Sequence, residues 1–213
     1  MLTPMDLADY DGELMLRYGG GDVGAFEALY ARQKGPLYRY LLRHVRDEAA
    51  ASDLFQEVWS KVIAARARYE ARAKFSTFLF HIAHHCTIDH HRRGRKGPSQ
   101  TAADEQTMAY AEPEVPEHQR PDRLAEISEQ RSALLEALAG LPVEQREAFL
   151  LREEGGLGVE DIARITGVGV ETAKSRLRYA VRKLRLALTE NPTTAQREPH
   201  PGAVPERMPA RAV

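Results

Sequence analysis

The 213-residue sequence contains a single cysteine, Cys86, and no long run of apolar residues. One cysteine cannot close an internal disulfide, so a disulfide-stapled fold is excluded and Cys86 is expected to be a small buried side chain. No segment approaches the roughly 18 consecutive apolar residues of a membrane helix. Residues 1–10 carry acids where an export signal needs basic residues and lack an apolar centre, so we expect a cytoplasmic location.

The sequence also has little net charge, −1, because segments of opposite sign cancel. In residues 66–96, eight basic side chains oppose two acidic ones, which leaves +6. In residues 98–123, six acids oppose two arginines, which leaves −4. Six basic side chains oppose one acid in residues 171–185. Two basic surfaces separated by an acidic connector favour a phosphate-rich partner such as nucleic acid.

Prolines divide the chain into two ordered blocks. Four of the 12 prolines fall in residues 97–123 and five in residues 191–213, and neither segment shows helical or strand periodicity. We therefore predict a flexible acidic linker at 97–123 and a disordered tail at 191–213. In residues 12–96 and 124–190, apolar residues recur at helical spacing and strand-like alternation does not persist. The expected fold is all-α, with two small helical domains joined by the linker.

The first block reads as a small helical bundle. Asp22 is placed to cap one helix, and Gly35-Pro36 predicts an interruption of it. A further helix over 47–66 has an apolar stripe, and a third begins at Ser76 or Thr77 and ends near Gly94. The face opposite that stripe is polar: Asp53, Gln56, Glu57, Ser60 and Lys61.

The second block carries a helix-turn-helix pattern. A short helix over 159–165 is followed by a glycine-containing turn at 167–169 and a basic helix over 170–188. Ala163 is small where the helices must cross, Gly167 can adopt the positive φ of the corner, and Ala173 is expected to face the core beneath it. Lysine and arginine can pair with phosphates, and arginine can also grip a guanine edge, so the pattern favours DNA over a merely solvated surface. The outward residues of the basic helix are Glu171, Thr172, Lys174, Ser175, Arg176, Arg178 and Tyr179.

Two sets of segments resemble one known family. Residues 141–152, 160–163 and 172–177 are similar to region 4 of extracytoplasmic-function (ECF) sigma factors, a subfamily of the sigma-70 family of RNA polymerase subunits. Residues 53–62 and 75–83, followed by Ile88-Asp89 and Arg92-Arg93, are similar to region 2 of the same proteins. Two matches in the right order are more specific than a helix-turn-helix alone.

The resemblance implies an alternative sigma factor without catalytic residues or cofactors. The polar face of the 47–66 helix would dock on the β′ clamp helices of core RNA polymerase, with further contact to the β subunit, and the helix over 170–188 would read the minus-35 element. The free protein would be a monomer held by an anti-sigma factor. The basic segment 66–95 would bind the minus-10 element and hold a flipped base. Its candidate residues are Arg72, Lys74, Phe75, His84, His85, Arg92 and Arg93, although core packing is the favoured role for Phe75, Phe78 and Phe80.

The sequence is also compatible with other function classes. One is a helix-turn-helix repressor that does not join polymerase, and another is a helical scaffold without DNA affinity. A third is a metal site at His81, His85 and Asp89, which recur at every fourth position of one helix beside His84. Three ligands spread over about 12 Å of a straight helix cannot converge on one ion, so a polar face near nucleic acid is favoured.

Overall fold

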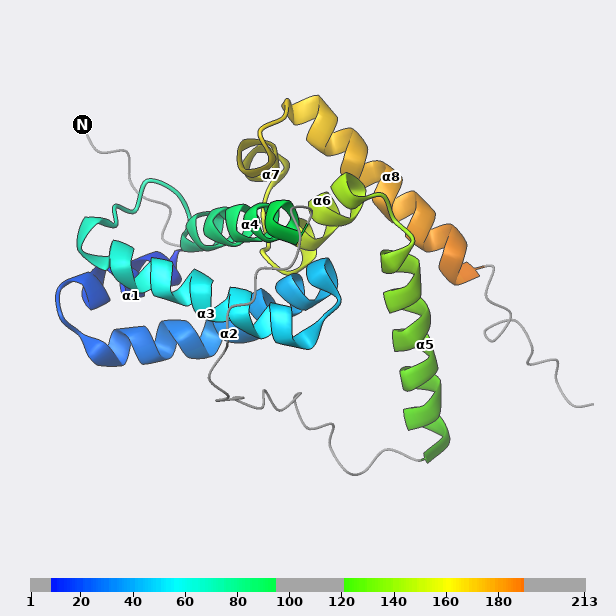
Figure 1. The fold of residues 1–213 in the computed structure, drawn as a ribbon, viewed down its shortest axis with the longest axis horizontal. Helices are drawn as coiled ribbons and strands as arrows, with labels where there is room; N and C mark the ends of the chain where they lie inside the picture. The colour runs from blue at the N-terminus through cyan, green and yellow to red at the C-terminus, as the bar shows by residue number, and fades with distance from the viewer. Residues whose placement is uncertain (1–8, 95–120, 190–213) are drawn as a thin grey trace, which may run out of the picture.

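The computed structural model describes residues 9–94 and 121–189, with backbone only for 121–129. The predicted tail at 191–213 and all but the last three residues of the predicted linker at 97–123 lie outside these residues. Every described element is helical, as predicted, and none of the described helices is long and apolar enough to cross a membrane. In chain order (Figure 1) they are α1 Tyr10–Gly19, α2 Val23–Val45, α3 Glu48–Ala65, the 3-10 turn η1 Arg66–Arg68, α4 Phe75–Gly94, α5 Pro121–Ala139, α6 Val143–Glu153, α7 Val159–Thr166 and α8 Val170–Thr189.

Side-chain caps start two of the long helices. The Asp22 carboxylate accepts a hydrogen bond from the Ala25 amide at 3.1 Å, which confirms the predicted cap of α2. The Asp47 carboxylate accepts one from the Ala50 amide at 2.7 Å and so begins α3. Each bond satisfies an amide that has no partner inside the helix.

The predicted interruption at Gly35-Pro36 is wrong. Helix α2 runs without a break through Pro36, although proline removes one helical hydrogen bond. Leu29 on one side of it and Leu37 and Tyr40 on the other are all 0 % exposed in the same core. Burial of these side chains favours one continuous helix and outweighs the local preference of the two breaking residues.

Helices α1 to α4 form the first group, in which aromatic rings fill much of the space between helices. Phe75 and Phe80 of α4 are both fully buried, so the packing role favoured for them is confirmed. The Trp59 ring packs edge-on against Phe26, with centroids 5.7 Å apart. Ile88, near the other end of α4, is by contrast 38 % exposed.

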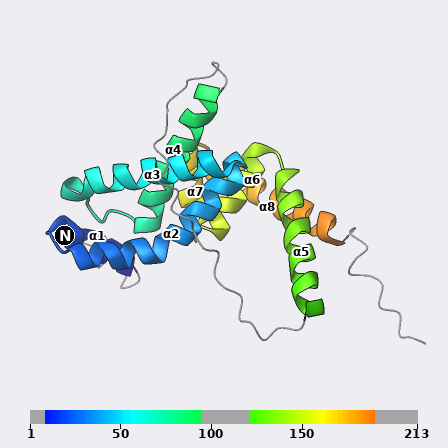
Figure 2. The same cartoon turned by 60° about the horizontal axis from the view of Figure 1, so that its bottom comes forward.

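Helices α5 to α8 form the second group. Leu138 and Leu141 pack with Ala180 and Leu184, which joins the end of α5 to α8. Figure 1 and Figure 2 show α5 projecting away from the rest of the molecule, while α6 and α7 lie against the first group. Helix α5 starts at Pro121, three residues before the predicted beginning of the second block.

The two groups share one hydrophobic cluster. Phe80 of α4 belongs to the same buried set as Leu157, which precedes α7, and Ile162 within α7. Gly155 lies close to α4, because a Cβ atom built there would lie 3.2 Å from the Phe80 ring. We call the contact between α2 or α4 and the segment 139–162 the interdomain seam.

Candidate nucleic-acid interface

The predicted helix-turn-helix is formed by α7 and α8. Gly167 ends α7 with φ of +67°, a conformation that glycine adopts without strain, and its amide donates to the Ala163 carbonyl. Ala163 is 4 % exposed at the helix crossing and Ala173 is 1 % exposed beneath α8. Three predicted features, the small crossing residue, the glycine corner and the inward alanine, are therefore confirmed.

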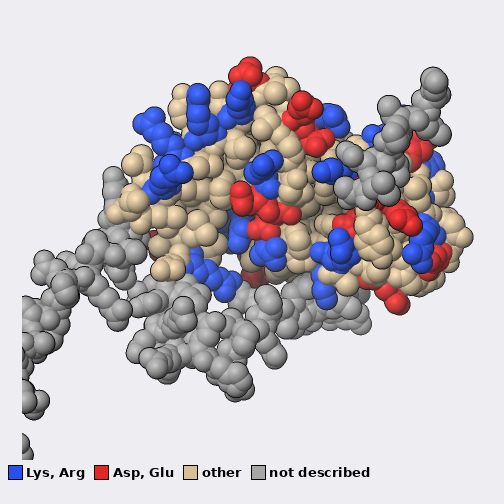
Figure 3. Space-filling model, turned by 180° about the vertical axis from the view of Figure 1, so that it is seen from behind, with Lys and Arg blue, Asp and Glu red and all other residues tan. Residues whose placement is uncertain are grey.

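The first turns of α8 present a charged face to solvent. Among the seven predicted residues, Glu171, Thr172, Lys174, Arg178 and Tyr179 are exposed, while Ser175 and Arg176 are half-buried. The Arg178 guanidinium lies 5.3 Å from the centre of the Tyr179 ring. Seen from behind in Figure 3, lysines and arginines gather at the upper left of the molecule, on the side where α8 lies. Such a surface can meet a phosphate backbone while its first turns reach base edges.

The predicted minus-10 residues divide into two sets. Arg72, Lys74, His85, Arg92 and Arg93 are exposed on α4 or the segment before it. Phe75 is 0 % exposed and His84 is 5 % exposed, so neither can contact DNA in this arrangement. The backbone amide of Phe75 donates to the Asp9 carboxylate at 2.7 Å, which anchors the start of α4.

His84 is covered by a carboxylate from the second group. Its Nδ1 atom hydrogen-bonds to Oε1 of Glu147 on α6, and the Tyr40 hydroxyl donates to the same oxygen at 3.3 Å. Burial alone would raise the pKa of Glu147, but the hydrogen bond from His84 and the neighbouring His44 outweigh it and lower that pKa. Burial, followed by the Glu147 charge, raises the pKa of Tyr40 well above its usual value. The cluster therefore holds a buried carboxylate in its charged form.

A second carboxylate closes the same seam. Glu154, at the end of α6, accepts hydrogen bonds from Arg39, at 2.9 Å, and from Arg43, both on α2. The Glu154 side chain is only 6 % exposed. Neither glutamate stands out in the sequence, because Glu147 lies in an amphipathic helix and Glu154 directly follows it, where charged residues are expected to face water.

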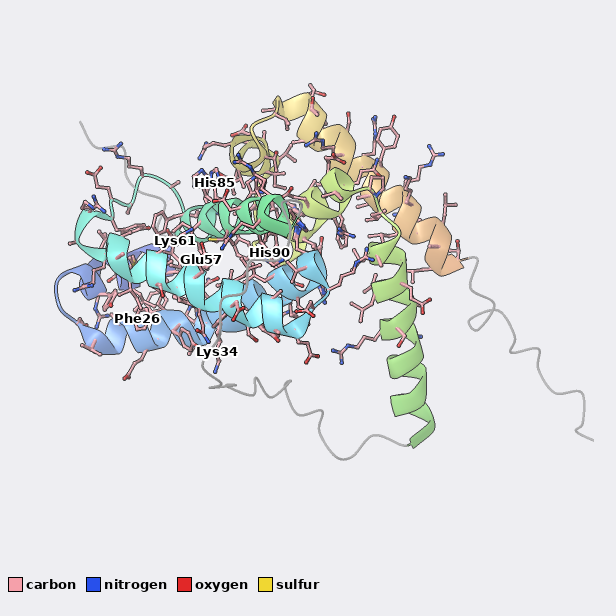
Figure 4. All side chains as sticks on the ribbon, viewed as in Figure 1. Phe26, Lys34, Glu57, Lys61, His85 and His90 are labelled. Atoms are coloured by element: carbon pink, nitrogen blue, oxygen red, sulfur yellow. The ribbon has the colours of Figure 1, made fainter. Side chains whose placement is uncertain are left out.

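The predicted polymerase-binding face lies on the outer side of α3. Asp53, Gln56, Ser60 and Lys61 are exposed, and Glu57 is half-buried. Figure 4 shows Glu57 and Lys61 side by side on this helix, where Lys61 Nζ lies 2.7 Å from the Glu57 carboxylate. Partial burial would raise the pKa of Glu57, but the hydrogen bonds from Lys61 and from Arg93 of α4 lower it. Lys61 also donates to the buried Cys86 sulfur at 3.2 Å, so α3 and α4 are linked beneath this face.

The three-ligand metal site does not form. Within residues 9–94 and 121–189, no group of three or more His, Cys, Asp or Glu side chains is arranged to hold an ion. His81 and His85 approach each other, whereas the Asp89 carboxylate lies 3.9 Å from Arg92.

Comparison with known protein families matches one segment in each of the two helical groups. The Sigma-70 region 2 family matches residues 29–97, and the Sigma-70, region 4 family matches residues 131–184. The chain is 33 % identical to the RNA polymerase sigma factor CarQ of Myxococcus xanthus over 177 residues, which cover 83 % of this chain and 96 % of that protein. The chain belongs to the ECF sigma factors of the sigma-70 family.

Further likenesses extend over most of this sigma factor. It is 34 % identical to the ECF RNA polymerase sigma factor SigL of Mycobacterium tuberculosis over 175 residues, which cover 79 % of this chain and 92 % of that one. The solved structure of sigma factor RpoE with the anti-sigma factor NepR from Bartonella quintana has a similar fold, with a TM-score of 0.57 and 23 % identity. That match covers 78 % of this sigma factor and 98 % of that chain.

Proposed function

We propose that this protein binds core RNA polymerase and directs promoter-specific initiation of transcription. In this proposal α4 and the segment before it recognise the minus-10 element, and α8 recognises the minus-35 element. The protein does so in the cytoplasm, without catalytic residues. The observation that carries the proposal is the pairing of a glycine-cornered helix-turn-helix with a region 2 bundle in one chain of an established sigma family. A repressor has no need of the region 2 bundle, so that alternative is set aside.

The exposed residues define the proposed contacts. On the minus-35 side these are the exposed side chains at the start of α8, above all Lys174 and Arg178. On the minus-10 side they are Arg72, Lys74, His85, Arg92 and Arg93, because Phe75 and His84 are buried in this arrangement. The polymerase would meet α3 through Asp53, Gln56 and Ser60 together with the Glu57–Lys61 pair, on the β′ clamp helices. An anti-sigma factor is the partner expected to control access to these faces.

Run-off transcription tests the proposal directly. Core polymerase, genomic fragments and the purified protein should give transcripts with defined start sites that core polymerase alone does not give. Replacing Lys174 and Arg178 together by alanine should reduce initiation at those promoters about tenfold or more, because each removes a phosphate or base contact.

The matched control is Arg185→Ala, which removes an exposed arginine from the C-terminal part of the same helix. Its transcript yield should stay within about twofold of the wild type, because recognition helices read bases through their first turns. A protein that neither binds core polymerase nor yields any defined transcript would refute the proposed function.

A further inference from the structure

Two histidines converge on the exposed face of α4. His81 and His85 are one helical turn apart, and their Nε2 atoms lie 3.2 Å from each other. The ring centroids are 4.5 Å apart and the rings are nearly perpendicular, at 75°. Without an ion, one Nε2–H donates to the other Nε2. Both Nε2 lone pairs become available to one ion when the donor ring carries its proton on Nδ1 instead of Nε2.

The separation of the two nitrogens matches the bite of a chelate. Imidazole nitrogen binds zinc-like ions at about 2.0 to 2.1 Å, so two such bonds meeting at about 100° span about 3.2 Å. That angle lies between the octahedral and tetrahedral values. Helix α4 fixes the pair, since residues four apart lie on the same face of a helix. Binding an ion therefore keeps the Nε2–Nε2 separation and requires the rings to turn until both lone pairs aim at one point.

Both rings are accessible, and their neighbours leave them free to bind. His81 and His85 are exposed, while His84, between them in sequence, is turned to Glu147 in the seam. Neutral imidazole is the form that binds metal.

We propose that His81 and His85 chelate one divalent late transition-metal ion, such as Ni²⁺, Cu²⁺ or Zn²⁺, with water in the remaining positions. Imidazole suits this class, whereas Mg²⁺ and Ca²⁺ prefer oxygen ligands. The site is a two-ligand chelate and differs from the three-ligand arrangement that the sequence suggested, because Asp89 takes no part. It needs neither polymerase nor DNA, so it can be tested apart from the proposed function.

Titration of the full-length, tag-free protein with Ni²⁺ tests the site. Calorimetry should give one ion per chain, and Mg²⁺ at the same concentration should give no binding. His81→Ala and His85→Ala should each weaken Ni²⁺ binding about tenfold or more, because the second ligand of a chelate binds at high effective concentration. A chelate loses affinity in each single variant, whereas two independent histidines would keep their affinity and lose one of two ions per chain.

His90→Ala is the matched control, because His90 lies on the same helix, beyond the pair, and is half-buried. It should bind Ni²⁺ like the wild type. A second readout guards against misfolding: Ni²⁺ should raise the thermal unfolding midpoint of the wild type and of His90→Ala but not of the His81→Ala, His85→Ala double variant. Equal Ni²⁺ affinity in the wild type and the double variant, or single-variant losses that simply halve the stoichiometry, would overturn the proposal.

Discussion

The two surfaces proposed to meet DNA differ in what covers them. The start of α8 projects from the fold, and five of its seven candidate side chains are exposed. On α4 the candidate side chains share their helix with the interdomain seam, so His84 is bound to Glu147 while His85, the next residue, is exposed. A basic or aromatic residue type therefore indicates a nucleic-acid surface only where no other segment of the chain packs on it.

The largest expected effect comes from removing the carboxylate that covers His84. Glu147→Ala leaves the buried His84 and Tyr40 without their partner, and breaking a buried charged hydrogen bond should lower the free energy of unfolding by about 3 to 4 kcal/mol. Urea unfolding followed by circular dichroism measures the loss.

Glu144→Ala provides the control, since Glu144 is an exposed carboxylate in the first turn of the same helix. Its effect should stay within about 0.5 kcal/mol, as for most surface substitutions. If the two variants proved equally stable, the seam would contribute nothing to the folded state.

The difference between the exposed face of α8 and the partly covered face of α4 also explains what the sequence could and could not predict. The helix-turn-helix follows from local signals, because Ala163, Gly167 and Ala173 lie within eleven residues of one another. The seam joins Glu147 to His84 and Tyr40, which precede it by 63 and 107 positions in the sequence. No periodicity of the sequence relates these residues. Core packing likewise overrode the local signal at Pro36. Local chemistry therefore identified α8 correctly, whereas the burial of His84 depends on the tertiary fold.

Acid should lower the stability of the folded protein through His44, another buried histidine of the interdomain seam. His44 of α2 is 4 % exposed, its Nε2 atom has no hydrogen-bond partner, and burial lowers its pKa to about 4. The charged or titratable groups that act on it are Glu147, Arg146, His91 and His84. Between about pH 6.5 and pH 4 the unfolded chain binds a proton at His44 that the folded chain does not, so stability is complete above this window and falls within it.

The expected loss of unfolding free energy across that window is up to about 3 kcal/mol. Urea midpoints at pH 7.5, 5.5 and 4.5 measure it. In His44→Phe, which keeps a ring against Tyr40 and cannot titrate, the decline between pH 7.5 and 5.5 should be clearly shallower. Parallel pH profiles for the two proteins would show that His44 is protonated in the folded state after all.

The smallest expected effect is on the salt dependence of DNA binding at the exposed start of α8. Lys174 is exposed in the second turn of α8 and has only a loose ion pair with Glu171, at 3.8 Å. If it contacts a phosphate, Lys174→Ala should reduce the slope of log binding constant against log salt by about 0.9, because one fewer counterion is released. Between 50 and 200 mM salt that amounts to about a threefold smaller loss of affinity. Lys183→Ala, which removes an exposed lysine nearer the C-terminal end of α8, should leave the slope unchanged. Promoter binding by the polymerase complex at several salt concentrations measures both slopes. A positioning contact should also weaken all promoters alike, whereas a change in promoter preference would mean that Lys174 reads a base instead.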